Sequence, residues 1–97
     1  MTVAVIFGRA LYTKDPLFAP RVGGEEAITA TSTSAPGSVT AKKDEHAQIT
    51  NTHTVAVLVN VNAAASTSAF RALVPVGTTM WIPKLGEGDV IHIKAVS

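Results

Sequence analysis

The residues that could bind a metal ion are few, and their spacing is unfavourable. The three histidines, His46, His53 and His92, are far apart in the sequence, and there is no cysteine to supply a thiolate. Metal-binding histidines usually come at short spacing on one rigid element, or share a face with carboxylates. We therefore expect no metal site and no cofactor, and we interpret the histidines as structural or exposed residues.

The serines, acids and glycines do not form a catalytic motif either. Nucleophilic catalysis needs a nucleophile with a base in reach and a donor for the oxyanion, but the serines lie in Thr/Ser-rich stretches without flanking glycines. The acids are scattered over turns rather than paired. The stretch 86–89, Gly-Glu-Gly-Asp, looks superficially like a phosphate loop, but its two acids would repel phosphate and a strand follows it. We interpret it as a hairpin turn and expect no enzyme activity.

The scarce aromatic residues are better candidates for binding than for catalysis. Trp81 lies on a short segment that ends at Pro83, and Tyr12 lies in a stretch interrupted by prolines. A scarce aromatic residue is usually either part of the core or an anchor in an interface, and the sequence leaves both alternatives open. The candidate partner-contact residues are Tyr12, Leu17, Phe18 and Trp81.

These residues must be positioned by short β-strands, of which residues 54–62 are the clearest. One face of this stretch carries only valines, namely Val55, Val57, Val59 and Val61. A period of two is typical of a half-buried strand. The opposite face carries no charge, which indicates that something covers it. We expect the segment Leu11–Phe18, from the same chain or a neighbour, to be that cover.

Similar alternation predicts about eight short strands and no helix, which is typical of an all-β domain. The other expected strands are Val3–Phe7, Glu26–Thr33, Val39–Ala41, His46–Asn51, Ala69–Val74, Thr79–Ile82 and Val90–Val96. The expected turns are Ser34–Ser38, Lys42–Glu45, Pro75–Thr78 and Leu85–Asp89. The predicted fold is a small antiparallel, jelly-roll-like β-sandwich or a small barrel.

The predicted organisation is a single domain, residues 1–97, with an N-terminal strand and arm at 1–25 and a sandwich core at 26–97. Prolines and a Gly-Gly pair predict that residues 8–24 are irregular. An irregular segment of this length is often functional. It either folds back over its own sheet or reaches a neighbouring subunit. For the turn Lys42–Glu45 the alternatives are a solvated hairpin tip and a charged recognition loop.

Composition limits the partners. Charged residues make up 15% of the 97 residues and the net charge is +1, so we expect neither nucleic-acid nor membrane binding through a charged face. The apolar run near Met1 is short and lacks a basic region before it, so we expect no signal peptide. The apolar fraction of 46% suits a modest core built mainly of Ala and Val.

The order of motifs in the C-terminal half resembles that of small β-sandwich virion proteins of tailed bacteriophages. The motifs are Ile49-Thr50-Asn51-Thr52, the valine strand, Pro75-Val76-Gly77-Thr78-Thr79 and the final stretch 85–93 with Gly88-Asp89-Val90-Ile91. The resemblance implies a non-enzymatic capsid decoration or cement protein that binds and stabilises the shell. Its expected partners are the major capsid protein or another virion protein and further copies of itself, as a trimer. Its expected location is the virion, assembled in the host cytoplasm. The alternative is a carbohydrate- or receptor-binding module of a tail fibre or appendage.

Overall fold

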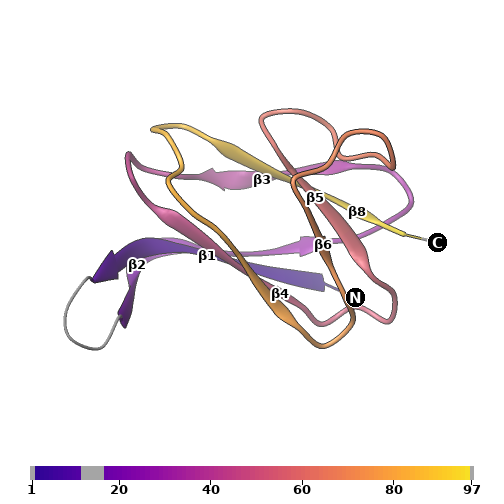
Figure 1. Ribbon diagram of the computed structural model, residues 1–97, viewed down its shortest axis with the longest axis horizontal. Helices are drawn as coiled ribbons and strands as arrows, with labels where there is room; N and C mark the ends of the chain where they lie inside the picture. The colour runs from indigo at the N-terminus through magenta and orange to yellow at the C-terminus, as the bar shows by residue number, and fades with distance from the viewer. Residues whose placement is uncertain (1, 12–16, 97) are drawn as a thin grey trace.

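The computed structural model describes residues 2–11 and 17–96, and these form eight β-strands (Figure 1). No helix, and hence no helix able to cross a membrane, occurs in these two ranges. The predicted all-β class is therefore confirmed. The strands are β1 (Thr2–Leu11), β2 (Leu17–Thr29), β3 (Ala35–Thr40), β4 (His46–Asn51), β5 (Val57–Val61), β6 (Ala72–Val74), β7 (Thr79–Ile82) and β8 (Val90–Ala95).

The strands form two antiparallel four-stranded sheets that face each other. Sheet A has the order β2-β1-β4-β7, and sheet B has the order β3-β8-β5-β6. All connections except β1–β2 and β5–β6 cross from one sheet to the other. If β1 is counted after β8, this is the strand order of a jelly roll. The expected jelly-roll-like sandwich is thus confirmed, with the N-terminal strand in the position that a last strand would occupy.

The core lies between the sheets and is filled by alternate side chains of each strand. Along β4 and β8 every second residue is buried, as period-two alternation requires. Most core side chains are valine, isoleucine and alanine, and Phe7 is the largest of those that are fully buried. Small side chains each remove little apolar area from water, at about 25 cal/mol per Å². The chain therefore depends strongly on backbone pairing and on well-placed polar contacts.

Strand β1 lies inside sheet A and not at its margin. It pairs with β2 on one side and with β4 on the other. It also places Val3, Val5 and Phe7 in the core, each at most 1% exposed. The predicted strand Val3–Phe7 is therefore confirmed and longer than expected. The expected assignment of the core to residues 26–97 alone is too narrow, because β1 is central to it.

The predicted irregular arm at residues 8–24 is wrong. Its described residues belong to the β1–β2 hairpin, which runs past the sheet (Figure 1). Proline is tolerated in edge strands, and β2 is the edge of sheet A, so Pro20 can pair opposite Gly8. The glycines lie in an irregularity of the ladder between Pro20 and Glu25, where Gly23 has a φ of 77°. The prolines and glycines that predicted an irregular segment are thus accommodated by an edge strand and by an irregularity in its pairing.

Two predicted turns are connections of another kind, and a third is misplaced. The turn Lys42–Glu45 joins β3 to β4, and Leu85–Asp89 joins β7 to β8. Both pairs of strands belong to different sheets, so neither connection is a hairpin. The turn expected at Ser34–Ser38 is wrong, because β3 begins at Ala35; Pro36 is tolerated there because β3 is also an edge strand.

The middle of the uncharged face of the central strand is buried within the chain at Leu58; of the segment Leu11–Phe18, which was expected to cover this face, residues 12–16 lie outside the described residues. Leu58 points away from the core, yet it is only 4% exposed. Across sheet B it is flanked by Lys94 and Leu73. The loop after β5 returns over this face, because the Ala65 N–H donates to Ser34 Oγ at 2.9 Å and Asn60 Nδ2 donates to Ala64 O at 3.3 Å. The hairpin expected to cover this face belongs to the other sheet.

Asn51 fixes the corner between β4 and β5. Its side chain is fully buried, and its Nδ2 donates to Val55 O at 3.0 Å and to Val74 O at 2.9 Å. Its Oδ1 accepts the His53 N–H at 2.8 Å. One amide therefore connects the end of β4, the approach to β5 and the end of β6. The preference of asparagine for local backbone bonds indicated such a corner from the sequence.

Replacing Asn51 with alanine should destabilise the fold more than the same change at Asn60. Asn51→Ala leaves buried backbone groups unpaired, at about 1–3 kcal/mol for each. Asn60→Ala removes one longer bond to Ala64 O from a partly exposed side chain. Urea unfolding of the two variants measures the difference. Equal losses in the free energy of unfolding would show that the corner bonds contribute little.

Candidate functional site

The four candidate partner-contact residues do not come together in one surface. Tyr12 lies outside the described residues. Leu17 and Phe18 lie in β2 at the far end of the hairpin, where they pair with Leu11 and Ala10. Trp81 lies on β7, at the opposite edge of sheet A, and is 46% exposed. The candidate contacts therefore divide into a hairpin end and a separate surface near β7.

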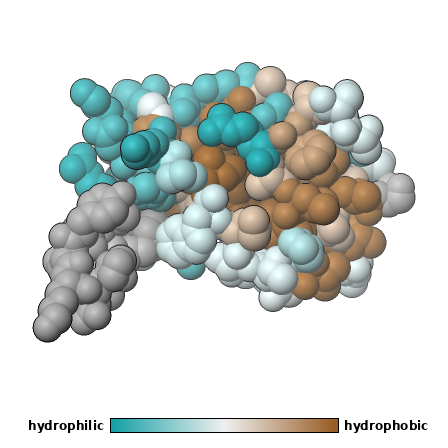
Figure 2. Space-filling view, viewed as in Figure 1, coloured by the Kyte–Doolittle hydropathy of each residue, from teal (hydrophilic) through white to brown (hydrophobic). Residues whose placement is uncertain are grey.

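The surface near β7 is apolar. Strands β6 and β7 are neighbouring edges of the two sheets. These strands and their adjoining loops carry five exposed apolar side chains, together called the β6–β7 surface: Phe70, Leu73, Val76, Met80 and Trp81. They are spread around the edge of the sandwich, since Trp81 lies on the outer face of sheet A and Leu73 on that of sheet B. Figure 2 shows apolar atoms gathered over the half of the molecule that holds β5 and β6. Exposed apolar side chains in one region are typical of contact surfaces.

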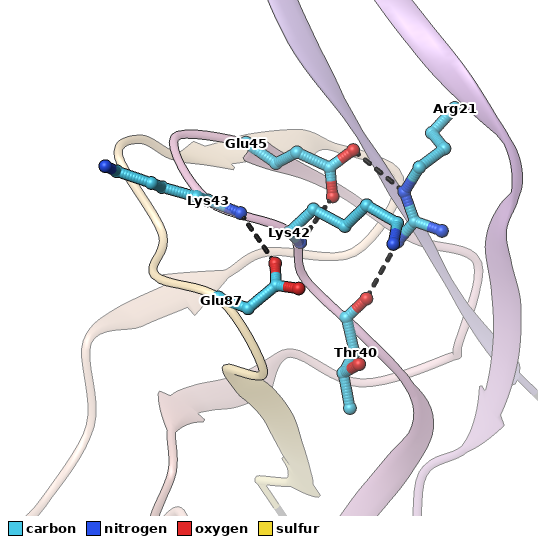
Figure 3. Close-up of polar contacts among 6 residues, drawn as sticks. All are labelled: Arg21, Thr40, Lys42, Lys43, Glu45 and Glu87. Carbon is cyan, nitrogen blue, oxygen red and sulfur yellow. Dashed lines mark hydrogen bonds and ion pairs between the residues drawn. The ribbon is translucent and has the colours of Figure 1, made fainter.

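A polar corner lies at the other end of the sandwich and was not expected. Glu45 is 2% exposed although it belongs to a charged turn. Its Oε2 accepts Arg21 Nε at 2.9 Å, and its Oε1 accepts the Lys42 N–H at 2.7 Å (Figure 3). Arg21 also donates from Nη2 to Thr40 O at 2.8 Å. The corner therefore ties β2 of sheet A to the end of β3 in sheet B.

The two connections at this end of the sandwich hold each other in place. The Leu85 N–H donates to Glu45 O, and the Asp44 N–H donates to Leu85 O, each at 2.8 Å. The Lys43 N–H donates to Glu87 Oε2 at 3.0 Å (Figure 3). Gly88 donates to Ala41 O at 2.8 Å. The loop 41–45 is thus held by hydrogen bonds; it exposes Lys42, Lys43 and Asp44 to solvent as one of its two sequence interpretations expected, but it is not a hairpin tip.

A pocket of about 370 Å³ lies beside this corner. It is lined by Arg9, Ala19, Arg21, Lys42 and Glu45. Its charges are three cations and one carboxylate, and the carboxylate is bonded to Arg21. The site cannot be found from the sequence, because its residues come from three separate segments that only the β1–β2 pairing and the inter-sheet loop bring together.

The histidines have separate positions in the structure. His53 Nδ1 accepts the Val55 N–H at 3.2 Å, so its Nε2 carries the proton that faces Ala30 O, also at 3.2 Å. His46 lies at the start of β4, and His92 lies on β8 in the other sheet. Among residues 2–11 and 17–96 no group of three His, Cys, Asp or Glu side chains is placed to hold a metal ion.

Two carboxylates have pKa values below their ordinary range. Burial raises the pKa of Glu26, but hydrogen bonds from the Ser38 hydroxyl and from the Ser38 and Val39 N–H groups outweigh it and lower the pKa. For Asp89, the hydrogen bond from Asn62 Nδ2 at 2.8 Å and that from the Gly86 N–H at 2.7 Å lower the pKa. Glu26 therefore binds backbone groups of β3 in the other sheet, and Asp89 binds the connection between β7 and β8, so both carboxylates have a structural role.

Glu26 should make the fold sensitive to acid. Because its pKa is lowered in the folded chain, its stabilising effect is fully present above the ordinary value of 4.5 and is lost as the pH falls through the folded value. Glu26→Gln should therefore reduce the loss of unfolding free energy between neutral pH and pH ~3. The control is Glu25→Gln, because the exposed Glu25 carboxylate accepts no hydrogen bond from any described residue. If both variants keep the wild-type acid dependence, the Glu26 contacts do not control it.

Removal of the Glu45 carboxylate should be costly. Glu45→Ala leaves Arg21 Nε and the Lys42 N–H without partners. We expect a loss of about 2–3 kcal/mol, below the ~3–5 kcal/mol typical of fully buried pairs, because Arg21 keeps partial access to water. Glu87→Ala, at an exposed acid that accepts one N–H bond, should cost less than about 1 kcal/mol. Thermal unfolding of both variants tests this order, and an equal cost would contradict it.

Comparison with known proteins identified no relative of this chain. No family model, no curated protein and no solved structure matches it.

Proposed function

We propose that this chain is a non-enzymatic structural protein of a bacteriophage virion, which binds and stabilises the capsid shell as a decoration or cement protein. It acts through contacts with further copies of itself and with the major capsid protein or another virion protein. The proposal rests on the resemblance of the motif order and on one feature of the fold, the projecting β1–β2 hairpin.

The hairpin is the observation that carries the proposal. The last residue of β1 that pairs with β4 is Gly8, opposite His46. Beyond it the ladder continues through three further pairs, from Arg9 with Ala19 to Leu11 with Leu17, with no third strand (Figure 1). Two-stranded ribbons are marginally stable in water on their own. A ribbon whose end carries Leu11, Leu17 and Phe18 gains most from a partner that buries these residues.

The chain also offers a surface that such a hairpin could meet. The β6–β7 surface is apolar and lies at the edge of sheet A opposite β2. A contact between two different surfaces of identical subunits is heterologous and closes into a ring when the rotation allows it. A trimer is the smallest ring of this kind. Many copies on a shell would repeat the same small contact, which raises the total binding strength.

One observation favours the alternative, a carbohydrate- or receptor-binding module of a tail fibre or appendage. Trp81 is 46% exposed and lies opposite Gln48 on the outer face of sheet A. The next outward-facing pair along these strands is Thr50 with Thr79, whose hydroxyls are 2.9 Å apart. An aromatic ring beside amide and hydroxyl groups is a common arrangement for sugar binding. It offers one aromatic residue rather than several, so the virion structural role is preferred.

The test compares the end of the hairpin with an exposed apolar position elsewhere on the same strand. The double variant Leu17→Ser, Phe18→Ser should lower self-association and shell binding by roughly a hundredfold or more, because each fully buried apolar side chain contributes about 1.5–3 kcal/mol. Val22→Ser is the control, since Val22 lies on β2 nearer the sheet and is 99% exposed. Light scattering measures the mass in solution, and co-sedimentation with shells of the phage that carries the gene measures binding.

Two results would overturn the proposal. One is a wild-type protein that stays monomeric and does not sediment with shells. The other is a double variant that assembles and binds as the Val22→Ser control does. If the wild-type protein ignores shells but binds surface polysaccharide, and Trp81→Ala abolishes that binding, the tail-module alternative replaces it.

A further inference from the structure

The pairing of β1 with β2 explains why the residues of the pocket at the base of the hairpin lie together. Arg9 pairs with Ala19 across the hairpin, and Arg21 follows Ala19 by two positions on the same strand. Period-two alternation places these three residues on one face of the ribbon. That face continues the inner face of sheet A beyond the core, since Phe7 on the same side of β1 is buried. The loop 41–45 faces it from the other sheet and completes the pocket.

The pocket has more positive charge than its own carboxylate neutralises. Arg21 is paired with Glu45, which is the one ion pair formed among the described residues. The Arg9 and Lys42 side chains are exposed and form no hydrogen bond or ion pair with any described residue. Two cations at the rim of a concave surface are therefore left without a partner among residues 2–11 and 17–96.

Arg21 is held in a fixed orientation at the wall of this pocket. Its Nε bonds Glu45 and its Nη2 bonds Thr40 O, so two points fix the plane of the guanidinium group. Neither bond uses Nη1, whose two N–H groups remain as donors. A guanidinium fixed by a buried carboxylate is an ordered donor for an oxyanion, because little side-chain entropy is left to lose.

We propose that this pocket binds a doubly charged oxyanion, a phosphate or sulfate group, with Arg9, Lys42 and Arg21 as its ligands. Two unpaired cations match the charge of a dianion better than that of a single carboxylate. A phosphomonoester carries about −1.5 to −2 charges at pH 7. The pocket volume of about 370 Å³ exceeds the space that one phosphate needs, and it lies at the lower end of the range for small-molecule sites. The group can therefore be the free ion or the terminus of a small phosphorylated or sulfated molecule.

The chain provides a matched pair of variants for the test. Lys42 and Lys43 are adjacent and both exposed, but only Lys42 lines the pocket. Figure 3 shows the Lys42 side chain extending towards Arg21, whereas the Lys43 side chain extends the other way. Lys42→Gln and Lys43→Gln change the net charge equally. The Lys42 N–H bond to Glu45 is made by the backbone, so the glutamine variant retains it.

The experiment is an NMR titration of the full chain that follows the backbone amides and the arginine Nε–H signals. The probes are sodium sulfate, inorganic phosphate and glycerol 3-phosphate, with sodium chloride at equal ionic strength as the reference. We expect saturable shifts at Arg21 and in the loop 41–45 with the three oxyanions but not with chloride. Lys42→Gln and Arg9→Gln should each weaken binding roughly tenfold, which corresponds to one charge-assisted hydrogen bond, and Lys43→Gln less than about twofold.

The outcomes distinguish a free ion from a phosphorylated molecule as the ligand, and they distinguish both from the absence of a specific site. Tighter binding of glycerol 3-phosphate than of phosphate points to a phosphorylated molecule, and equal binding points to the free ion. Shifts that do not saturate, that chloride reproduces, or that Lys42→Gln and Lys43→Gln reduce equally would overturn the site, because they indicate general screening of positive charge. The result is independent of shell binding, so it stands or falls separately from the proposed virion role.

Discussion

The structure depends on the placement of β1 between β2 and β4. Within sheet A, β1 is the only neighbour of β2, so β2 joins that sheet through it. The same strand supplies Val3, Val5 and Phe7 to a core that otherwise consists mainly of small side chains. The hairpin and the cationic pocket are extensions of this pairing beyond the sheet. Core, projecting hairpin and pocket therefore form together when one N-terminal strand joins the sheet.

The sequence pattern predicted a strand well where that strand's own residues were sufficient to define it. His46–Asn51 is a strand with the expected bounds, and Val90–Val96 differs by one residue at its end. The wrong predictions concern features that depend on pairing between segments far apart in the sequence. Nothing within residues 8–24 indicates an edge position, where proline is tolerated, or a ladder irregularity that accommodates the glycines. The uncharged face around Leu58 correctly indicated a cover, but the sequence did not identify which loop provides it.

The polar contacts likewise divide into those that local sequence predicts and those that depend on segments far apart in the chain. Loops and contacts between strands are held by side chains that accept backbone N–H groups, and several of the chain's acids act in this way. Glu26 accepts from Ser38 and Val39, Glu45 from Lys42, Asn51 from His53, Asn62 from Val90 and Asp89 from Gly86. The bonds within a turn follow from local sequence preferences, as for Asn51. The pairing of Glu45 with Arg21 does not, because it joins the connection between β3 and β4 to a residue of β2 that lies 24 positions away in the sequence.

The two ends of the molecule differ in the kind of contact that they can make, and this difference follows from the core. Small side chains gain little from burial, so the sandwich cannot enclose every apolar residue, and Phe70, Leu73 and Trp81 remain exposed beside the β6–β7 edge. At the hairpin base a buried carboxylate requires a cation, and Arg21 meets that requirement. Arg9 and Lys42 add charge beyond it. Cations that face one another in a pocket oppose folding unless an anion neutralises them, and among the described residues the fold itself uses the one carboxylate there for Arg21.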